Sequence, residues 1–147
     1  LVDPEQREQR CQFDHVWIQK LQAEGIASFA RAWEKLPLWS SQESLPTDLL
    51  EKQREQRLAH DPHQLAHALR ALSTGRMPAM WHQLESLTMP VELVVGTGDQ
   101  KYRAIAEAMI EHLPQASFSL IDEAGHNPIL ENPAAIRAIL TASKAHE

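Results

Sequence analysis

The sequence has few of the features that mark several large classes of protein. It contains one cysteine, Cys11, which excludes a disulfide within the chain and a zinc site built on cysteines. No run of about 18 apolar residues occurs, and no charged start precedes an apolar leader, so we expect a soluble, cytoplasmic protein without a membrane segment. The 14 basic residues are scattered and the net charge is −6, so no nucleic-acid partner is expected.

The length of the chain and its first residue bear on what kind of domain it forms. The 147 residues, of which 43% are apolar, are enough for one ordinary domain. The chain begins with Leu1 rather than Met, at a sequence typical of a helix entry in the middle of a protein. We therefore expect an amino-terminal part that this sequence does not include.

The first 87 residues have the patterns of helices and little else. Asp3 and Pro4 form a helix start, and Gly25 is expected to end that helix. Apolar residues at helical spacing predict further helices over 26–35, 46–59 and 62–72, with a turn over 39–44 and a short helical piece over 80–84. We interpret 1–87 as a helical cap region.

From residue 88 the pattern changes to alternating strands and helices. Strands are predicted over 91–95 and 117–121, and helices over 103–112 and 133–143, which is the signature of a parallel sheet. The run from Val91 to Val95 is expected to be buried on both faces. Because two parallel strands do not complete a domain, the fold class predicted is α/β, with 88–147 as the carboxyl-terminal βαβα part of a larger core.

An acid and a histidine follow these two strands. Asp99 comes after the first strand in a glycine-rich turn, and His126 comes after the second. Such a pair can orient and assist a nucleophile in a triad, and the order of acid before histidine is that of the α/β-hydrolases, in which a serine precedes both. No Gly-x-Ser-x-Gly occurs here. The alternatives are a turn role for Asp99, a helix-capping role for His126, and Asp122 as a rival acid.

Several strings of residues resemble a known family. They are Phe29 to Trp39, Gln56 to Leu58, Leu69 to Trp81, Gly98 to Tyr102, and Ala124 to Pro133. On these strings the chain resembles the α/β-hydrolase superfamily and, within it, the menaquinone-pathway synthases of 2-succinyl-6-hydroxy-2,4-cyclohexadiene-1-carboxylate, known as MenH. The resemblance covers the whole chain but only the last half of a full-length member.

The resemblance implies a fold, an activity and a set of site residues. The fold is the carboxyl-terminal part of an α/β-hydrolase, with a helical cap followed by the last two parallel strands and their helices. The activity is a lyase step in which the triad removes a proton and pyruvate is expelled, without metal or cofactor. Asp99 would be the acid and His126 the base, while Trp33 and Arg57 would line the cavity for a small polycarboxylate substrate. The serine would belong to a missing amino-terminal half, so the isolated chain is expected to be inactive.

Other interpretations of the same residues stay open at this stage. Trp33 fits an ordinary helix core, and Arg57 fits a solvated helix face beside Glu51 and Arg54. The chain could also be part of an esterase or a carbon–carbon hydrolase on the same scaffold. A different class again is a non-catalytic partner or degenerate fragment that docks through an exposed sheet edge.

Overall fold

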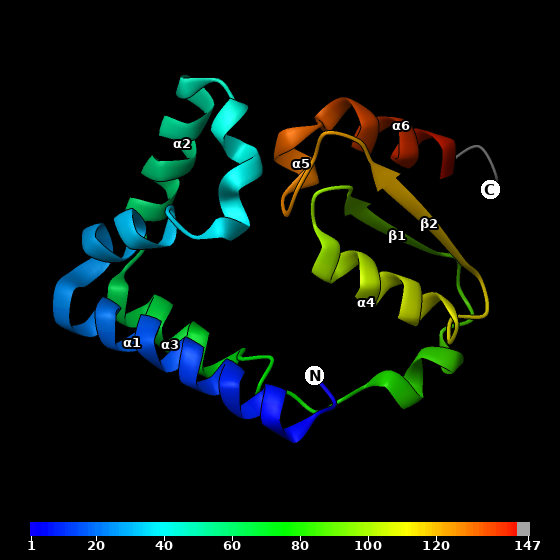
Figure 1. The fold of residues 1–147 in the computed structure, drawn as a ribbon, viewed down its shortest axis with the longest axis horizontal. Helices are drawn as coiled ribbons and strands as arrows, with labels where there is room; N and C mark the ends of the chain where they lie inside the picture. The colour runs from blue at the N-terminus through cyan, green and yellow to red at the C-terminus, as the bar shows by residue number, and fades with distance from the viewer. Residues whose placement is uncertain (144–147) are drawn as a thin grey trace. The chain divides into compact units, whose positions relative to one another are not determined.

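The fold divides into two units. The computed structural model describes residues 1–143, and its contacts separate a helical unit from a unit that contains the sheet (Figure 1). The first unit comprises Leu1–Leu36 and Pro46–Ala79, and the second comprises Pro37–Leu45 and the chain from Met80 onward. The cap was predicted over 1–87, whereas the contacts group 37–45 and 80–87 with the sheet.

Three helices build the first unit: α1 (Pro4–Trp33), α2 (Thr47–Leu58) and α3 (Pro62–Ala71). Asp3 begins α1 by accepting the amide of Glu5 at 2.8 Å, and Asp61 begins α3 by accepting that of Gln64 at 2.8 Å. Both helices start with proline, which lacks the amide that a first turn would leave unpaired. Within residues 1–143 no helix is both long and apolar enough to cross a membrane.

Helix α1 has a break at Gly25. Its backbone angles there are φ 76° and ψ −179°, a region that essentially only glycine occupies. The sequence predicted that one helix ends at Gly25 and another begins at Ile26. The break confirms that position, although the two helices run on as one kinked element to Trp33.

An aromatic cluster forms the core of the first unit. Trp17 meets Phe29 and Trp33 edge-on, with ring centroids 5.5 and 5.0 Å apart, and Phe29 stacks on Trp33 at 5.4 Å. The buried members of this core are Trp17, Ile18, Leu21, Phe29 and Ala66. Since the rings come from both sides of Gly25, the kink in α1 lets its two halves contribute to one core.

The second unit contains a parallel two-stranded sheet. Its elements are η1 (Pro37–Ser44), η2 (Trp81–Ser86), β1 (Val91–Gly96), α4 (Gln100–Ile110), β2 (Ala116–Ile121), α5 (Pro128–Glu131) and α6 (Pro133–Ser143). The strands pair in parallel from Val91 with Ala116 to Gly96 with Ile121. Both predicted strands are confirmed. The predicted turn over 39–44 is a 3-10 helix, and the four-residue α5 was not predicted.

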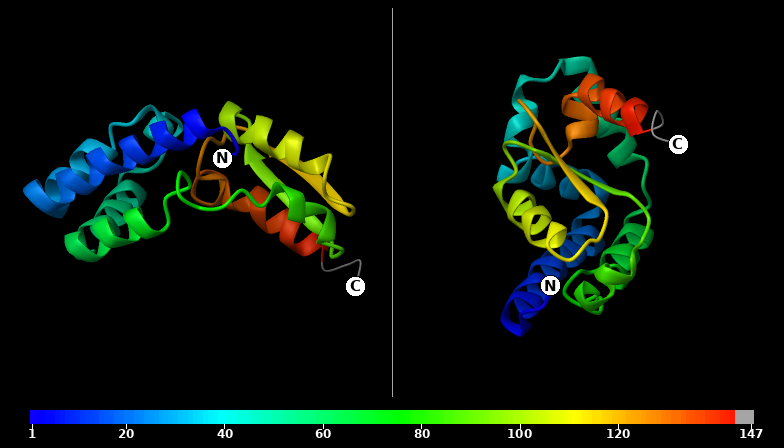
Figure 2. Two further views of the ribbon diagram at one scale, coloured as in Figure 1. Left: turned by 90° about the horizontal axis from the view of Figure 1, so that it is seen from below. Right: turned by 90° about the vertical axis from the view of Figure 1, so that its right-hand side faces the viewer.

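Helices cover both faces of this sheet, but incompletely. Helix α4 lies on one side and α6 on the other, as the views in Figures 1 and 2 agree. Only Val95 and Gly96 of β1 are buried, and the four residues before them are half-buried. The prediction that Val91 to Val95 is buried on both faces is therefore wrong within this chain, because β1 has one neighbouring strand in the described sheet.

Candidate active site

The predicted acid lies where β1 gives way to α4. Asp99 is the N-cap residue of α4, and its Oδ1 accepts the amide N–H of Tyr102 at 3.1 Å. This bond satisfies one of the amides that a helix start leaves unpaired, and it fixes the carboxylate in place. The second oxygen, Oδ2, is then available to another residue.

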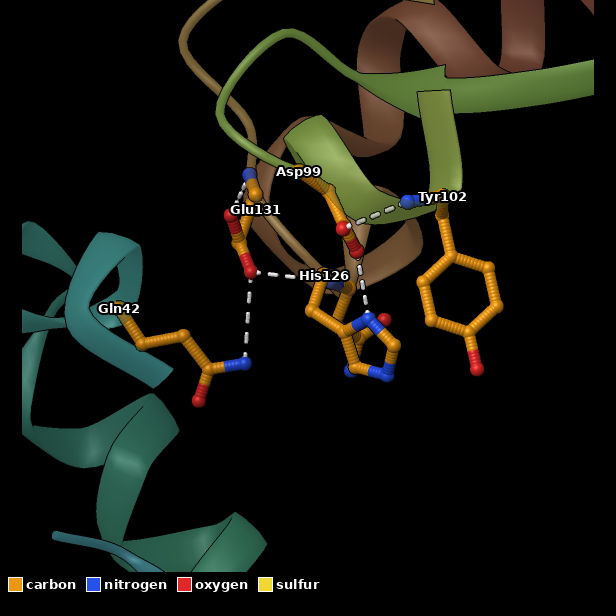
Figure 3. Close-up of polar contacts among 7 residues, drawn as sticks. Gln42, Asp99, Tyr102, His126 and Glu131 are labelled. Atoms are coloured by element: carbon orange, nitrogen blue, oxygen red, sulfur yellow. Dashed lines mark hydrogen bonds and ion pairs between the residues drawn. The ribbon is translucent and has the colours of Figure 1, made fainter. Parts of the chain in front are cut away.

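The predicted base, His126, contacts that second oxygen of Asp99. Nδ1 of His126, in the loop after β2, lies 2.6 Å from Oδ2 of Asp99 (Figure 3). The imidazole side chain is 26% exposed and the carboxylate 9% exposed, so the acid is the more sheltered partner. The structure thus brings together two residues that were singled out because they follow neighbouring parallel strands. Asp122, the rival acid, lies exposed in the turn after β2.

Backbone contacts hold the two loops together. The amide of Thr97 donates to the carbonyl of Ile121, and the amide of Gly98 donates to that of Ala124, both at 2.9 Å. At Gly96 a Cβ atom would run into the carbonyl group of Ala124. A glycine at the end of β1 therefore permits the close approach on which the acid–histidine contact depends.

Two aromatic rings flank the imidazole. The Trp39 ring, from η1, lies 5.6 Å from that of His126, and the Tyr102 ring, from α4, lies 5.0 Å from it. The sequence had not singled out either residue as part of a site. Both stand at the ends of strings that carried the family resemblance, which was the one available signal.

The arrangement suits proton transfer. With Asp99 accepting from Nδ1–H of His126, the neutral ring keeps its lone pair on Nε2, the nitrogen that can act as a base. The carboxylate also stabilises the cation that forms when Nε2 takes up a proton. Within residues 1–143 no group of three or more histidine, cysteine, aspartate or glutamate side chains could hold a metal ion.

The two predicted substrate contacts, Trp33 and Arg57, lie in the helical unit. Trp33 is half-buried against the aromatic core described above. Nη1 of Arg57 donates to Oε1 of Glu34 at 3.2 Å, and Nη1 of Arg54 donates to Oε2 of the same carboxylate at 2.6 Å. Arg57 is the more sheltered of the two arginines, with 19% of its side chain exposed against 43%. Its role at a site stays a prediction.

The chain is similar to proteins of known family. A family model described as the alpha/beta hydrolase family matches residues 1–139. A protein of Bacillus subtilis, provisionally named 2-succinyl-6-hydroxy-2,4-cyclohexadiene-1-carboxylate synthase, is 31% identical over 87% of this chain and 47% of its own length.

Two solved structures resemble the fold. MenH from S. aureus superposes with a TM-score of 0.94 at 32% identity, over 97% of this chain and 53% of that one. A thermophilic esterase from Thermogutta terrifontis superposes with a TM-score of 0.76 at 26% identity, over 97% of this chain and 51% of that one. The chain therefore spans about half the length of these relatives.

Proposed function

The chain belongs to the alpha/beta hydrolase family and has the fold of its carboxyl-terminal part, as predicted, and we propose a function on that basis. The chain supplies the acid and the base of a catalytic triad. The complete enzyme is a 2-succinyl-6-hydroxy-2,4-cyclohexadiene-1-carboxylate synthase. The nucleophilic serine would come from the portion of the relatives that this chain does not span. The 2.6 Å contact between His126 and Asp99 is the observation that carries the proposal. Similarity to MenH supports the choice of reaction.

The proposed chemistry is a proton abstraction followed by elimination. A serine hydroxyl is a weak base, so neutral His126 accepts its proton at Nε2 while the serine oxygen removes a proton from a substrate carbon. The electron pair of the broken C–H bond forms the new ring double bond, and the C–O bond to the leaving group breaks. The leaving group departs with the electron pair of the broken C–O bond as an enolate. It becomes pyruvate when it takes up the proton held by His126, which leaves the imidazole neutral again. Asp99 orients the imidazole throughout and stabilises its cationic form.

The helical unit is proposed to supply the substrate contacts. The expected substrate carries several carboxylates, for which the planar, doubly donating guanidinium of Arg57 is the suitable partner. Trp33 would offer an apolar wall beside the substrate ring. A chain of net charge −6 repels a polycarboxylate at long range, so recognition must be local.

Ester hydrolysis is the second candidate function. It is supported by the similarity to the Thermogutta terrifontis esterase, and the same acid–histidine pair could activate a serine for attack on a carbonyl carbon. The two functions differ in the first step. The lyase uses serine as a base toward a C–H group, whereas the esterase uses it as a nucleophile and forms an acyl-enzyme.

Supplying the nucleophile-bearing half tests the proposal. We define the reconstituted protein as this chain fused to, or co-expressed with, the amino-terminal half of a relative. It is expected to release pyruvate from the synthase substrate, and His126→Ala should abolish the release. A soluble reconstituted protein that releases no pyruvate but hydrolyses esters, with the same dependence on His126, would favour the second candidate. A folded protein with neither activity would favour a non-catalytic fragment.

A further inference from the structure

The loop that carries His126 is held by one carboxylate, that of Glu131. Its Oε2 accepts the amide N–H of Gly125, and its Oε1 accepts the amide N–H of Asn127 at 3.1 Å (Figure 3). The residues directly before and after the histidine are therefore bound to the same side chain. Nothing in the synthase chemistry derived above uses this carboxylate.

A third donor reaches the same group from a distant part of the sequence. Nε2 of Gln42, in η1, lies 3.4 Å from Oε1 of Glu131, and Gln42 is only 4% exposed. A half-buried carboxylate loses some of its hydrogen bonds to water, and protein donors must replace them. Three N–H groups provide that compensation here, and two of them belong to the histidine loop.

Helix capping accounts for only part of this pattern. Asn127 is the N-cap of α5, and its side chain accepts the amide of Leu130 while the Glu131 side chain accepts the amide of Asn127. That reciprocal pair resembles a capping box and would stabilise α5 by itself. The bond to Gly125 lies outside the helix, on the far side of His126, and a cap has no need of it.

Gly125, the residue before the histidine, has no side chain that would obstruct the contact with Glu131. A Cβ on Gly125 would meet the side chain of Ser41 and would lie 3.3 Å from Oε2 of Glu131. Only a residue without a side chain lets η1 and the carboxylate approach the loop so closely. The backbone bonds between the two site loops end at Ala124, and the amides of Gly125 and Asn127, which follow it in the loop, both donate to Glu131.

We propose that Glu131 is a positioning residue for His126. By binding the amides on both sides of the histidine, it keeps the loop in the conformation that sets Nδ1 against Asp99. It acts through the backbone and touches no reacting atom. Its effect on turnover rests on the proposed function, whereas its effect on the geometry of the acid–histidine pair does not.

Two variants of Glu131 test whether both carboxylate oxygens are needed to hold the loop. Glu131→Gln keeps the size of the side chain but has one acceptor oxygen, so one loop amide must face an NH2 group instead. Glu131→Asp keeps both oxygens and shortens the reach. Glu111→Gln is the matched control, because it removes the same charge from an exposed glutamate at the end of α4.

The spectroscopic test measures the ring nitrogens of His126 by proton–nitrogen NMR in the 147-residue chain, with signals assigned by comparison with His126→Ala. The unaltered chain and Glu111→Gln should show a single Nδ1–H tautomer with a slowly exchanging proton. Glu131→Gln should show mixed tautomers and loss of that proton signal, with Glu131→Asp in between. An unaltered signal in Glu131→Gln overturns the proposal. If Glu131→Gln does not fold, an unaltered signal in Glu131→Asp overturns it equally.

The kinetic test uses the reconstituted protein. Glu131→Gln should lower kcat about tenfold to a hundredfold, the range expected for a misplaced catalytic group, while KM stays within about twofold. A change in KM alone would contradict a positioning role. If the unaltered reconstituted protein releases no pyruvate, the proposed function fails, and the NMR result still decides whether Glu131 positions His126.

Discussion

The carbonyl oxygen of Gly125 occupies the place where a side chain on Gly96 would begin. Gly96 ends β1, and Gly125 directly precedes the histidine, so the two glycines mark the contact between the acid loop and the histidine loop. Their backbones touch because Gly96 carries no side chain, whereas a side chain on Gly125 would instead meet Ser41 and Glu131. The acid–histidine pair is therefore built on a tight backbone contact as well as on its own hydrogen bond.

Replacing Gly96 with alanine should disrupt this contact. The new methyl group would push against backbone rather than against a flexible side chain, and overpacking of this kind costs about 1–3 kcal/mol. Denaturant unfolding of the chain should show a loss in that range. Gly98→Ala is the control, because its Cβ would lie 3.2 Å from the carbonyl oxygen of Ala124 and needs a smaller adjustment. Equal losses for the two variants would contradict the prediction.

Asp99→Asn should separate the two roles of the acid. Asparagine caps helices as well as aspartate does, so the start of α4 and the free energy of unfolding should change by less than about 0.5 kcal/mol. The imidazole loses its charged acceptor, and kcat of the reconstituted protein should fall by about 10⁴, as in other triads. Asp99→Ala should lose the cap as well, at a further cost of about 1 kcal/mol. A nearly active Asp99→Asn would argue against a triad.

The ring of Tyr102, rather than its hydroxyl group, should matter to His126. Tyr102→Phe keeps a ring 5.0 Å from the imidazole, whereas Tyr102→Leu removes it. Aromatic rings shift the NMR signals of protons near their faces, so the carbon-bound protons of His126 should keep their positions in Tyr102→Phe and move in Tyr102→Leu. The same shifts in both variants would show that the hydroxyl group is responsible.

Arg57 should bind substrate more than it accelerates the reaction. Charge-assisted hydrogen bonds contribute about 1.5–3 kcal/mol, so Arg57→Gln should raise KM of the reconstituted protein roughly 10- to 100-fold with little change in kcat. Arg54→Gln removes the same charge and contacts the same carboxylate of Glu34, and it should change KM far less. If the Arg54 variant has the larger effect, the assignment of Arg57 is wrong.

Gly25→Ala should destabilise the chain even though it places a better helix former inside α1. Helix propensity alone predicts a gain of about 1 kcal/mol. The backbone at Gly25 instead occupies a region that costs other residues about 1–3 kcal/mol. Apart from adjacent residues and nearby backbone of the same helix, no atom lies within 4 Å of its Cβ position, so we attribute the cost to backbone conformation. Thermal unfolding shows whether Gly25→Ala raises or lowers the stability of the chain. Ala27→Gly, on the exposed side of the same helix, should cost about 0.5–1 kcal/mol.

The parts of the fold that depend on neighbouring residues were predictable from the sequence. The start of α3 depends on Pro62 and on a hydrogen bond from the amide of Gln64 to the side chain of Asp61, only three residues away. The break in α1 depends on the backbone conformation of Gly25 alone. The strands were predictable because a short β-branched run in β1 and a short apolar run in β2 each end in a turn. The approach of Asp99 to His126 followed from one further rule, that the ends of neighbouring parallel strands lie at the same edge of a sheet.

The surroundings of the histidine could not be predicted in this way. Gln42 and Glu131 lie 89 positions apart in sequence, and no local periodicity connects them. Trp39 was expected in a turn, but it belongs to a 3-10 helix and its ring contacts that of His126. The four-residue α5 is too short to have a periodic pattern, although Asn127 and Pro128 are ordinary helix-start residues.

The division of the chain limits how this protein could exchange modules with its relatives. The polypeptide passes between the two units three times, because 37–45 belongs with the sheet while the residues on either side belong with the helices. Recombination that transplanted residues 1–79 as a block would carry Trp39 and Gln42 away from the histidine they accompany. A new helical region could be grafted without disturbing His126 only if it kept this nine-residue segment, so the segment should be inherited with the sheet-containing unit rather than with the helical unit.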